Sequence, residues 1–217
     1  MNKRCLVINP NTSEAVTDTV LAACRQAQPG VRWEGATARF GAAYIADEVA
    51  YAKAAHAALD AWEAFHAGQD AVLLACFGDP GLLALRELAR VPVIGLAQSS
   101  FEAAAQRGRF AVVTGGHAWA PMLSRFARLH GLDAKLVGIH TIDWTGAQIA
   151  ADPDGALDAL VAAAQKGIDA GAQCILLGGA ALTGLTPSLQ PRLSVPVLDN
   201  VLLAAQTVVD ALASASH

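Results

Sequence analysis

The chain has 217 residues, of which 54% are hydrophobic and 16% charged, and its formal net charge is -4. That length fits one large domain or two small ones, and the scattered Lys and Arg residues form no basic stripe for nucleic acid. No apolar run approaches the ~18–20 residues of a membrane span, and no signal-peptide pattern opens the chain. We therefore expect a cytoplasmic protein, with no membrane or nucleic-acid partner, that binds a small molecule and forms a homo-oligomer.

The first half of the chain alternates strands and helices. Asn11 followed by Glu14 predicts a capping box at the start of the first helix. The second helix carries Val49, Ala52, Leu59 and Trp62 at helical spacing, as in an amphipathic helix. In order, we expect a strand over residues 4–8, a helix to about 27, a strand over 31–38, a loop over 40–44, a helix to about 66, a strand over 71–75, a helix to 90 and a strand over 91–95.

The second half repeats this alternation. We expect a helix over 98–106, a strand over 110–114, a turn over 115–117, a helix to about 130, a strand over 135–139, an irregular loop over 143–155, a helix over 156–170, a strand over 173–177, a strand over 195–198 and a closing helix over 200–213. Strands that alternate with helices predict an α/β fold with parallel sheets covered on both faces.

The stretch DAVLLACFGDPGLLA at 70–84 holds the main candidate for chemistry. Its apolar half is typical of a strand buried on both faces, and Cys76 lies where that strand ends and a turn begins. In open α/β sheets ligands bind outside the carboxyl ends of the strands. A following helix terminus and free backbone N–H groups would lower the pKa of a thiol there. The alternative is that Cys76 is a small buried hydrophobic residue.

The other cysteines show no functional pattern. Cys5 and Cys174 fall inside expected strands and Cys24 inside an expected helix, so we interpret all three as packing residues. No CxxC pair or His cluster has the spacing of zinc ligands. The sequence therefore predicts no metal site, and only Cys76 lies at a strand's carboxyl end.

The two halves align with each other at an offset of about 103–105 residues. Residues 70–82 fall on 173–185, residues 91–93 on 195–197, and residues 6–9 on 111–114. The alignment predicts two similar α/β lobes related by a pseudo-two-fold, 1–96 plus 200–217 and 97–199, with the active site in the cleft between them. It also makes Gly179 the counterpart of Cys76.

These residues resemble the aspartate/glutamate/hydantoin racemase superfamily, and within it the hydantoin and allantoin racemases. The most specific motifs are VINPNTS at 7–13, ACFGDPGL at 75–82 and PVIG at 92–95. The resemblance implies two four-stranded α/β lobes, no metal or organic cofactor, and two cysteines that move a proton at the acidic carbon of the substrate. Cys76 matches the first cysteine, whereas the turn of the second has the sequence Gly178-Gly179.

The resemblance leads to a cofactor-independent racemase or isomerase that acts on a hydantoin-like or amino-acid-like carbon acid. All these reactions pass through an enolate-like anion, which needs an acid-base group and donors aimed at the developing negative oxygen. Cys76 is the expected acid-base group. The expected substrate-binding residues are Asn11, Thr12, Tyr44, Phe77, Gly78, Thr114, His117, Gly179, Ala180 and Ala181.

Other functions are open at this stage. The superfamily contains an arylmalonate decarboxylase with one catalytic cysteine, so a single-cysteine decarboxylase of malonate-type acids is one alternative. A cysteine hydrolase with Cys76 as nucleophile and His117 as base is another, as is a non-catalytic ligand-binding relative. A dinucleotide site is not expected, because no G-x-G-x-x-G follows a predicted strand.

Overall fold

A computed structural model describes residues 3–144, 148 and 152–215. The expected loop over 143–155 therefore lies in part outside the described residues. The chain divides into two compact units, Met1–Ser99 with Val201–His217 and Ser100–Asn200, which we call unit 1 and unit 2. It passes from unit 1 to unit 2 within helix α4 (Leu96–Arg107) and returns at the first residue of α9 (Asn200–Ser214).

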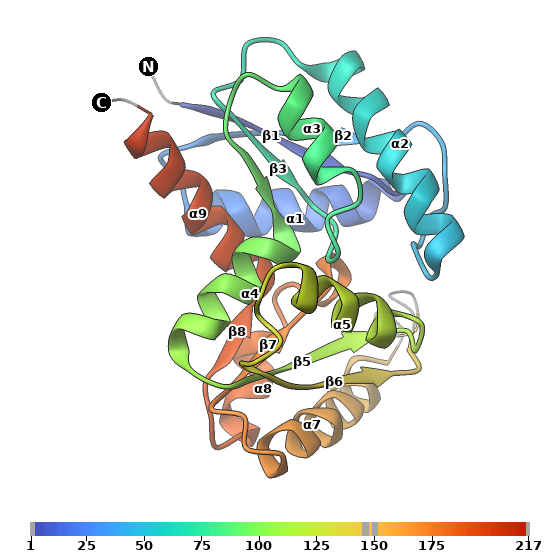
Figure 1. Cartoon of the computed structure of the whole chain (residues 1–217), viewed down its shortest axis with the longest axis vertical. Coiled ribbons are helices and arrows are strands. Elements are labelled where there is room, and N and C mark those ends of the chain that lie inside the picture. Colours follow the sequence, from blue (N-terminus) through green and yellow to red (C-terminus); the bar gives the residue numbers. More distant parts are fainter. Residues whose placement is uncertain (1–2, 145–147, 149–151, 216–217) are drawn as a thin grey trace. The chain divides into compact units, whose positions relative to one another are not determined.

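Unit 1 contains a four-stranded parallel sheet in the order β2-β1-β3-β4 (Figure 1). Helices α1 and α9 cover one face of this sheet, and α2 and α3 cover the other. A hydrogen bond from Gln28 to Gln206 links the end of α1 to α9. The elements are β1 (Arg4–Asn9), α1 (Glu14–Ala27), β2 (Arg32–Thr37), α2 (Glu48–Phe65), β3 (Ala71–Leu74), α3 (Leu82–Leu88) and β4 (Val93–Gly95).

Unit 2 repeats this topology with a parallel sheet in the order β6-β5-β7-β8. The elements are β5 (Phe110–Gly115), α5 (Trp119–Leu129), β6 (Leu136–Ile142), α7 (Pro153–Asp169), β7 (Cys174–Leu177), the short helices η1 (Ala180–Leu182), α8 (Thr186–Leu189) and η2 (Gln190–Arg192), and β8 (Val197–Asp199). The expected pair of four-stranded parallel α/β sheets is confirmed.

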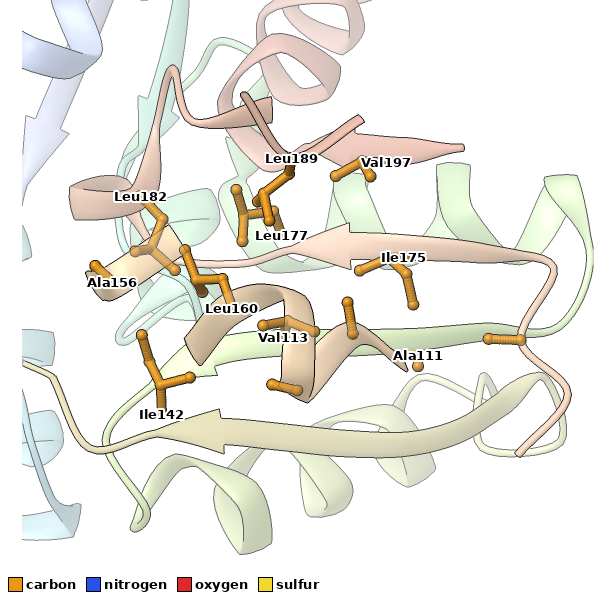
Figure 2. Packing of buried hydrophobic residues seen from close by; sticks show 13 residues of the cluster. Ala111, Val113, Ile142, Ala156, Leu160, Ile175, Leu177, Leu182, Leu189 and Val197 are labelled. Atoms are coloured by element: carbon orange, nitrogen blue, oxygen red, sulfur yellow. The ribbon is translucent and has the colours of Figure 1, made fainter. Parts of the chain in front are cut away.

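The core of each unit lies on the faces of its sheet. Figure 2 shows Val113, Ile142 and Leu177, from three strands of unit 2, packed with Leu160 of α7 in one apolar layer. Fully burying a side chain of this kind stabilises the fold by about 1.5–3 kcal/mol. Strands β1, β3, β5 and β7 are buried along nearly their whole length, which is why their sequences are continuous apolar runs. The sheets thus hold the residues that follow their strands in fixed positions.

The expected capping box at the first helix is wrong. The N-cap of α1 is Ser13, whose side chain makes no capping bond. The Oδ1 atom of Asn11 instead accepts hydrogen bonds from the Ser13 N–H, at 2.8 Å, and from Nδ2 of Asn9, at 3.0 Å. Asn side chains commonly bond the backbone two residues ahead in this way. Asn11 therefore shapes the turn before the helix.

The expected apolar face of the second helix is wrong for Val49 and Ala52, which are exposed. Val49 is 65% exposed, and the buried residues of α2 are Ala54, Ala57, Ala58 and Ala61. Leu59 and Trp62 are half-buried and pack against the core, as expected. A stripe of alanines lets a helix approach a sheet closely, but hydrophobic periodicity gives most weight to the large residues. Periodicity of the large residues therefore did not reveal the alanine-lined face of α2 that packs on the sheet.

Candidate active site

Cys76 lies in a loop that joins β3 to α3, which we call the Cys76 loop (residues 75–81). The loop leaves the sheet with a hydrogen bond from the Ala75 N–H to the carbonyl oxygen of Ile8. It then turns twice, because the Asp79 N–H donates to the Cys76 carbonyl oxygen and the Leu82 N–H donates to the Asp79 carbonyl oxygen. The thiol is therefore at the C-terminal edge of the sheet, as expected for a ligand-binding position.

The backbone of the Cys76 loop requires glycine where it passes α2. Gly81 has a φ of 81°, and a Cβ atom there would lie 2.9 Å from the carbonyl oxygen of Ala55. Gly78 has a φ of 147°, and its carbonyl oxygen accepts a hydrogen bond of 2.7 Å from the hydroxyl of Tyr51. Helix α2 thus fixes the loop by close packing and by one hydrogen bond.

The environment of Cys76 keeps the thiol protonated. Burial raises the pKa of this thiol well above its ordinary value, and the negative charge of Asp79 raises it further. The expected lowering of the pKa by a helix terminus is wrong, since α3 begins only at Leu82 and has seven residues. Both effects favour the neutral thiol, the form of Cys76 that donates a proton, over the thiolate.

The turn after β1 lies at the same edge of the sheet. Asn9 is fully buried, and its Nδ2 atom donates to Asn11, to the Ser13 carbonyl oxygen and to the Thr17 hydroxyl. The Thr12 N–H donates to the carbonyl oxygen of Ala42. This bond joins the turn to the 40–44 loop that carries Tyr44, whose exposed fraction is 38%. Asn11, Thr12 and the 40–44 loop are therefore held together.

In unit 2, Thr114 and Gly179 lie next to each other at the C-terminal edge of the sheet. A Cβ atom added to Gly179 would lie 3.6 Å from Oγ1 of Thr114, an ordinary contact distance. Gly179 has a φ of 118° and precedes the short helix η1, which begins with Ala180 and Ala181. There is space for a side chain at 179, but the backbone conformation disfavours one.

His117 follows β5 but turns toward the edge strand β6. Its Nδ1 atom is 2.8 Å from the hydroxyl oxygen of Thr141, and its Nε2 atom is 4.0 Å from a carboxylate oxygen of Asp143. Gly179 follows β7, on the opposite side of β5. The structure therefore places His117 on the β6 side of unit 2 and away from the strand that carries Gly179.

The strand registers make Gly179 the structural counterpart of Cys76. Ile8 pairs with Leu74 in unit 1, and Val113 pairs with Leu177 in unit 2. Cys76 and Gly179 each lie two residues beyond the end of the third strand of their sheet.

The two units place a carboxylate differently near the equivalent strand ends, Gly95 and Asp199. Leu74 pairs with Gly95 in unit 1, and Leu177 pairs with Asp199 in unit 2. The Asp199 carboxylate accepts a hydrogen bond of 3.1 Å from the Gly184 N–H, so it reaches from the strand end to the loop. In unit 1 the carboxylate belongs to the loop residue Asp79.

Two negative findings apply to the part of the chain that the structure describes. No group of three or more His, Cys, Asp or Glu side chains there is arranged to hold a metal ion. None of the helices there is long and apolar enough to cross a membrane.

Comparison with known proteins assigns the family. The family model described as Asp/Glu/Hydantoin racemase matches residues 5–208. The chain belongs to the Asp/Glu/hydantoin racemase family. This family relation identifies it as an enzyme of the racemase type, an isomerase.

Similar proteins are hydantoin and allantoin racemases. The hydantoin racemase of Pseudomonas sp. (strain NS671) is 32% identical over 213 residues, which cover 94% of this chain and 85% of that protein. An allantoin racemase from Pseudomonas fluorescens has a TM-score of 0.93 at 30% identity, covering 98% of this chain and 92% of that one. An allantoin racemase from Klebsiella pneumoniae has a TM-score of 0.90 at 32% identity, covering 98% of this chain and 89% of that one.

Sequence reasoning missed Tyr51, Asp79 and Thr141 as residues that brace the candidate site. Tyr51 and Thr141 gave no signal, because each makes a contact far away in the sequence. For Asp79, a signal is present in the sequence at the start of α4. Helix α4 begins with Leu96 directly after a strand and has no Ser, Thr, Asp or Asn to cap it, so its cap had to come from another segment.

Proposed function

We propose that this racemase moves a proton at the acidic carbon of a hydantoin-type ring and that Cys76 is the acid-base group. The observation that carries the proposal is the position of Cys76, held at the end of β3 by the Cys76 loop in a chain whose relatives are hydantoin and allantoin racemases. Hydantoins and allantoin each carry the reacting hydrogen on a ring carbon next to a carbonyl group. Loss of that proton gives an enolate.

The proposed mechanism needs donors for the enolate oxygen. In unit 1 we assign this role to the backbone N–H groups of Phe77 and Gly78, with Asn11, Thr12 and Tyr44 shaping the pocket. In unit 2 we assign it to the backbone N–H groups of Ala180 and Ala181, with Thr114 beside Gly179 and with His117 as further substrate-binding residues. Fixed backbone donors of this kind lower a barrier by about 2.7–4 kcal/mol each where they face the developing charge.

Inversion at carbon needs one group to remove a proton and another to return it to the opposite face. Cys76 supplies one group, and its counterpart Gly179 has no side chain. Exchange at one face needs only Cys76, which removes the substrate's hydrogen as the thiolate and then returns a proton to the same face as the thiol. We therefore propose that the chain exchanges the acidic hydrogen of its substrate faster than it inverts the carbon.

The test is an exchange and chirality assay in deuterated water. Enantiopure 5-substituted hydantoins and allantoin are followed by proton NMR for loss of the C–H signal and by chiral chromatography for inversion. Cys76→Ala should abolish exchange, whereas Cys24→Ala, which removes a fully buried thiol of α1, should retain it. Exchange at the wild-type rate in Cys76→Ala would refute the role of Cys76.

A second candidate function is decarboxylation of a malonate-type acid. Two observations favour it: Cys76 is held as a neutral thiol, and Gly179 leaves the equivalent position without an acid or base. After CO₂ leaves, the enolate needs only one proton donor. Release of CO₂ from aryl- and alkylmalonates, absent in Cys76→Ala, would establish this reaction. Tight ligand binding by calorimetry with neither exchange nor CO₂ release would indicate a binding protein.

We also propose that the protein is a cytoplasmic homo-oligomer. The support for the location is that all four cysteines are free thiols, as is usual in a reducing compartment. For self-association, contact with a second copy would cover exposed apolar side chains such as Leu83 or Leu129. Light scattering and cell fractionation test the two parts.

A further inference from the structure

The Cys76 loop contains a carboxylate of its own at Asp79. This residue is only 4% exposed, and its φ of 55° is in the left-handed region. Asp tolerates this conformation better than most residues, but holding it there costs of the order of 1 kcal/mol unless the surroundings compensate. The fold must therefore supply contacts that hold Asp79 in place.

Those contacts come from the first turn of α4. Oδ1 of Asp79 accepts a hydrogen bond of 2.8 Å from the Ala97 N–H, and Oδ2 accepts one of 2.7 Å from the Gln98 N–H. The first N–H groups of a helix have no partner within the helix, and a carboxylate is favoured there. Asp79 therefore caps α4 from a different segment of the chain, and the Cys76 loop and α4 hold each other in place.

Gly95 leaves room for this contact. It ends β4 beside Leu74, the last residue of β3. A Cβ atom built on Gly95 would overlap the Asp79 carboxylate. Any side chain at position 95 would therefore displace the carboxylate from the first turn of α4.

We propose that Asp79 is the positioning residue of the Cys76 loop: by capping α4 it fixes the thiol and the loop N–H groups that act on the substrate. The part about the substrate rests on the proposed function of Cys76. The capped helix is the one within which the chain passes from unit 1 to unit 2, so the same carboxylate ties the thiol loop to a segment that joins the units.

The charge of Asp79 has a second effect that can be measured separately. Burial raises the pKa of the Cys76 thiol, and the negative charge of Asp79 raises it further. Removing the charge should lower the pKa of Cys76. A residue that stabilised the fold at a distance, without its charge or its contacts reaching the Cys76 loop, would leave the ionisation of Cys76 unchanged.

Three variants separate these effects. Asp79→Asn removes the charge and leaves one acceptor oxygen, whereas Gly95→Ala keeps the charge and displaces the carboxylate. The control is Asp70→Asn, at the opposite end of β3, where the carboxylate accepts a hydrogen bond of 2.8 Å from the Arg4 N–H. For each variant, peptide mapping gives the rate of Cys76 alkylation by iodoacetamide from pH 6 to 10, and the exchange assay gives kcat and KM.

For Asp79→Asn we expect the alkylation profile to move to lower pH, with a rate at pH 8 about tenfold higher. We expect kcat to fall about 10–100-fold with a smaller change in KM, because the reacting groups are misplaced. Gly95→Ala should lower kcat similarly while its alkylation profile moves less. Asp70→Asn should match the wild type in both measurements.

The proposal is overturned if the profile and kcat of Asp79→Asn coincide with those of Asp70→Asn. If Asp79→Asn does not fold, Gly95→Ala decides, and an unchanged kcat in that variant overturns the proposal. If the alkylation profile shifts while no variant, nor the wild type, exchanges any substrate, the proposed function fails and the positioning role of Asp79 stands.

Discussion

The hydroxyl of Tyr51 donates a hydrogen bond of 2.7 Å to the carbonyl oxygen of Gly78, which ties α2 to the Cys76 loop. Tyr51→Phe removes this bond and keeps the ring. We expect the free energy of unfolding to fall by about 1 kcal/mol and turnover to fall with it, because the loop loses its hydrogen bond to α2. Urea unfolding and the exchange assay measure both. Thr207→Val removes a comparable bond, to the Leu203 carbonyl oxygen, and should lower stability without lowering turnover.

On the proposed function, Gly179→Cys should add racemisation to the exchange of a proton at one face. A thiol supplies the missing acid, worth about 10²–10⁴-fold in rate. The φ of 118° at Gly179 makes the substitution cost about 1–3 kcal/mol of stability. Thermal unfolding and chiral chromatography measure the two effects.

The control for that variant is Gly179→Ala, which has the same backbone cost and no thiol. It should be destabilised equally and should not racemise. Rapid racemisation by the wild type or by Gly179→Ala would show that the second proton comes from water or from another residue.

Cys76 should be the first thiol to react with iodoacetamide, and it should react slowly at neutral pH. It is 8% exposed, whereas Cys5, Cys24 and Cys174 are at most 1% exposed. Burial raises the pKa of Cys76, so its thiolate is scarce at pH 7 and labelling should accelerate as the pH rises. Peptide mapping after timed labelling gives the order. Faster labelling of any other cysteine contradicts the assignment.

Stability should decrease below about pH 6.5, the ordinary pKa of histidine, in a way that depends on His140. Burial, and to a lesser extent the charge of Lys166, lowers the pKa of His140, and its Nε2 atom has no hydrogen-bond partner among the described residues. The unfolded chain therefore takes up this proton at a higher pH than the folded chain does. His140→Leu should be at least as stable as the wild type at pH 7 and lose less stability at pH 5. If urea unfolding gives the same loss of stability from pH 7 to pH 5 for both proteins, the prediction is contradicted.

The strands and the internal repeat could be predicted because strands buried on both faces are continuous apolar runs. Leu74 and Leu177 end two such runs, so counting two residues onward from each was enough to match Cys76 with Gly179. Prediction failed where small or polar residues decide the structure. The inner face of α2 is made of alanines, and the side chain of Asn11 bonds within its own turn.

The bracing of the candidate site could not be predicted for a different reason. Asp79 reads as an ordinary turn residue, and its partners Ala97 and Gln98 offer only backbone N–H groups, which every residue except proline has. Likewise, the pKa of Cys76 depends on how deeply the thiol is buried and on how its loop folds back, and neither is a property of the local sequence.

The differently placed carboxylates make the two loops unequal as places for new chemistry. In unit 1 the anchor Asp79 is in the same loop as the thiol, so rewriting that loop also uncaps α4. In unit 2 the anchor Asp199 is outside the loop and holds a backbone N–H of Gly184. The side chains of Ala180 and Ala181, which lie outside the core, can therefore be exchanged without removing that carboxylate. A protein engineer who wants to switch the chain between one-thiol and two-thiol reactions has the freer choice of residues in unit 2.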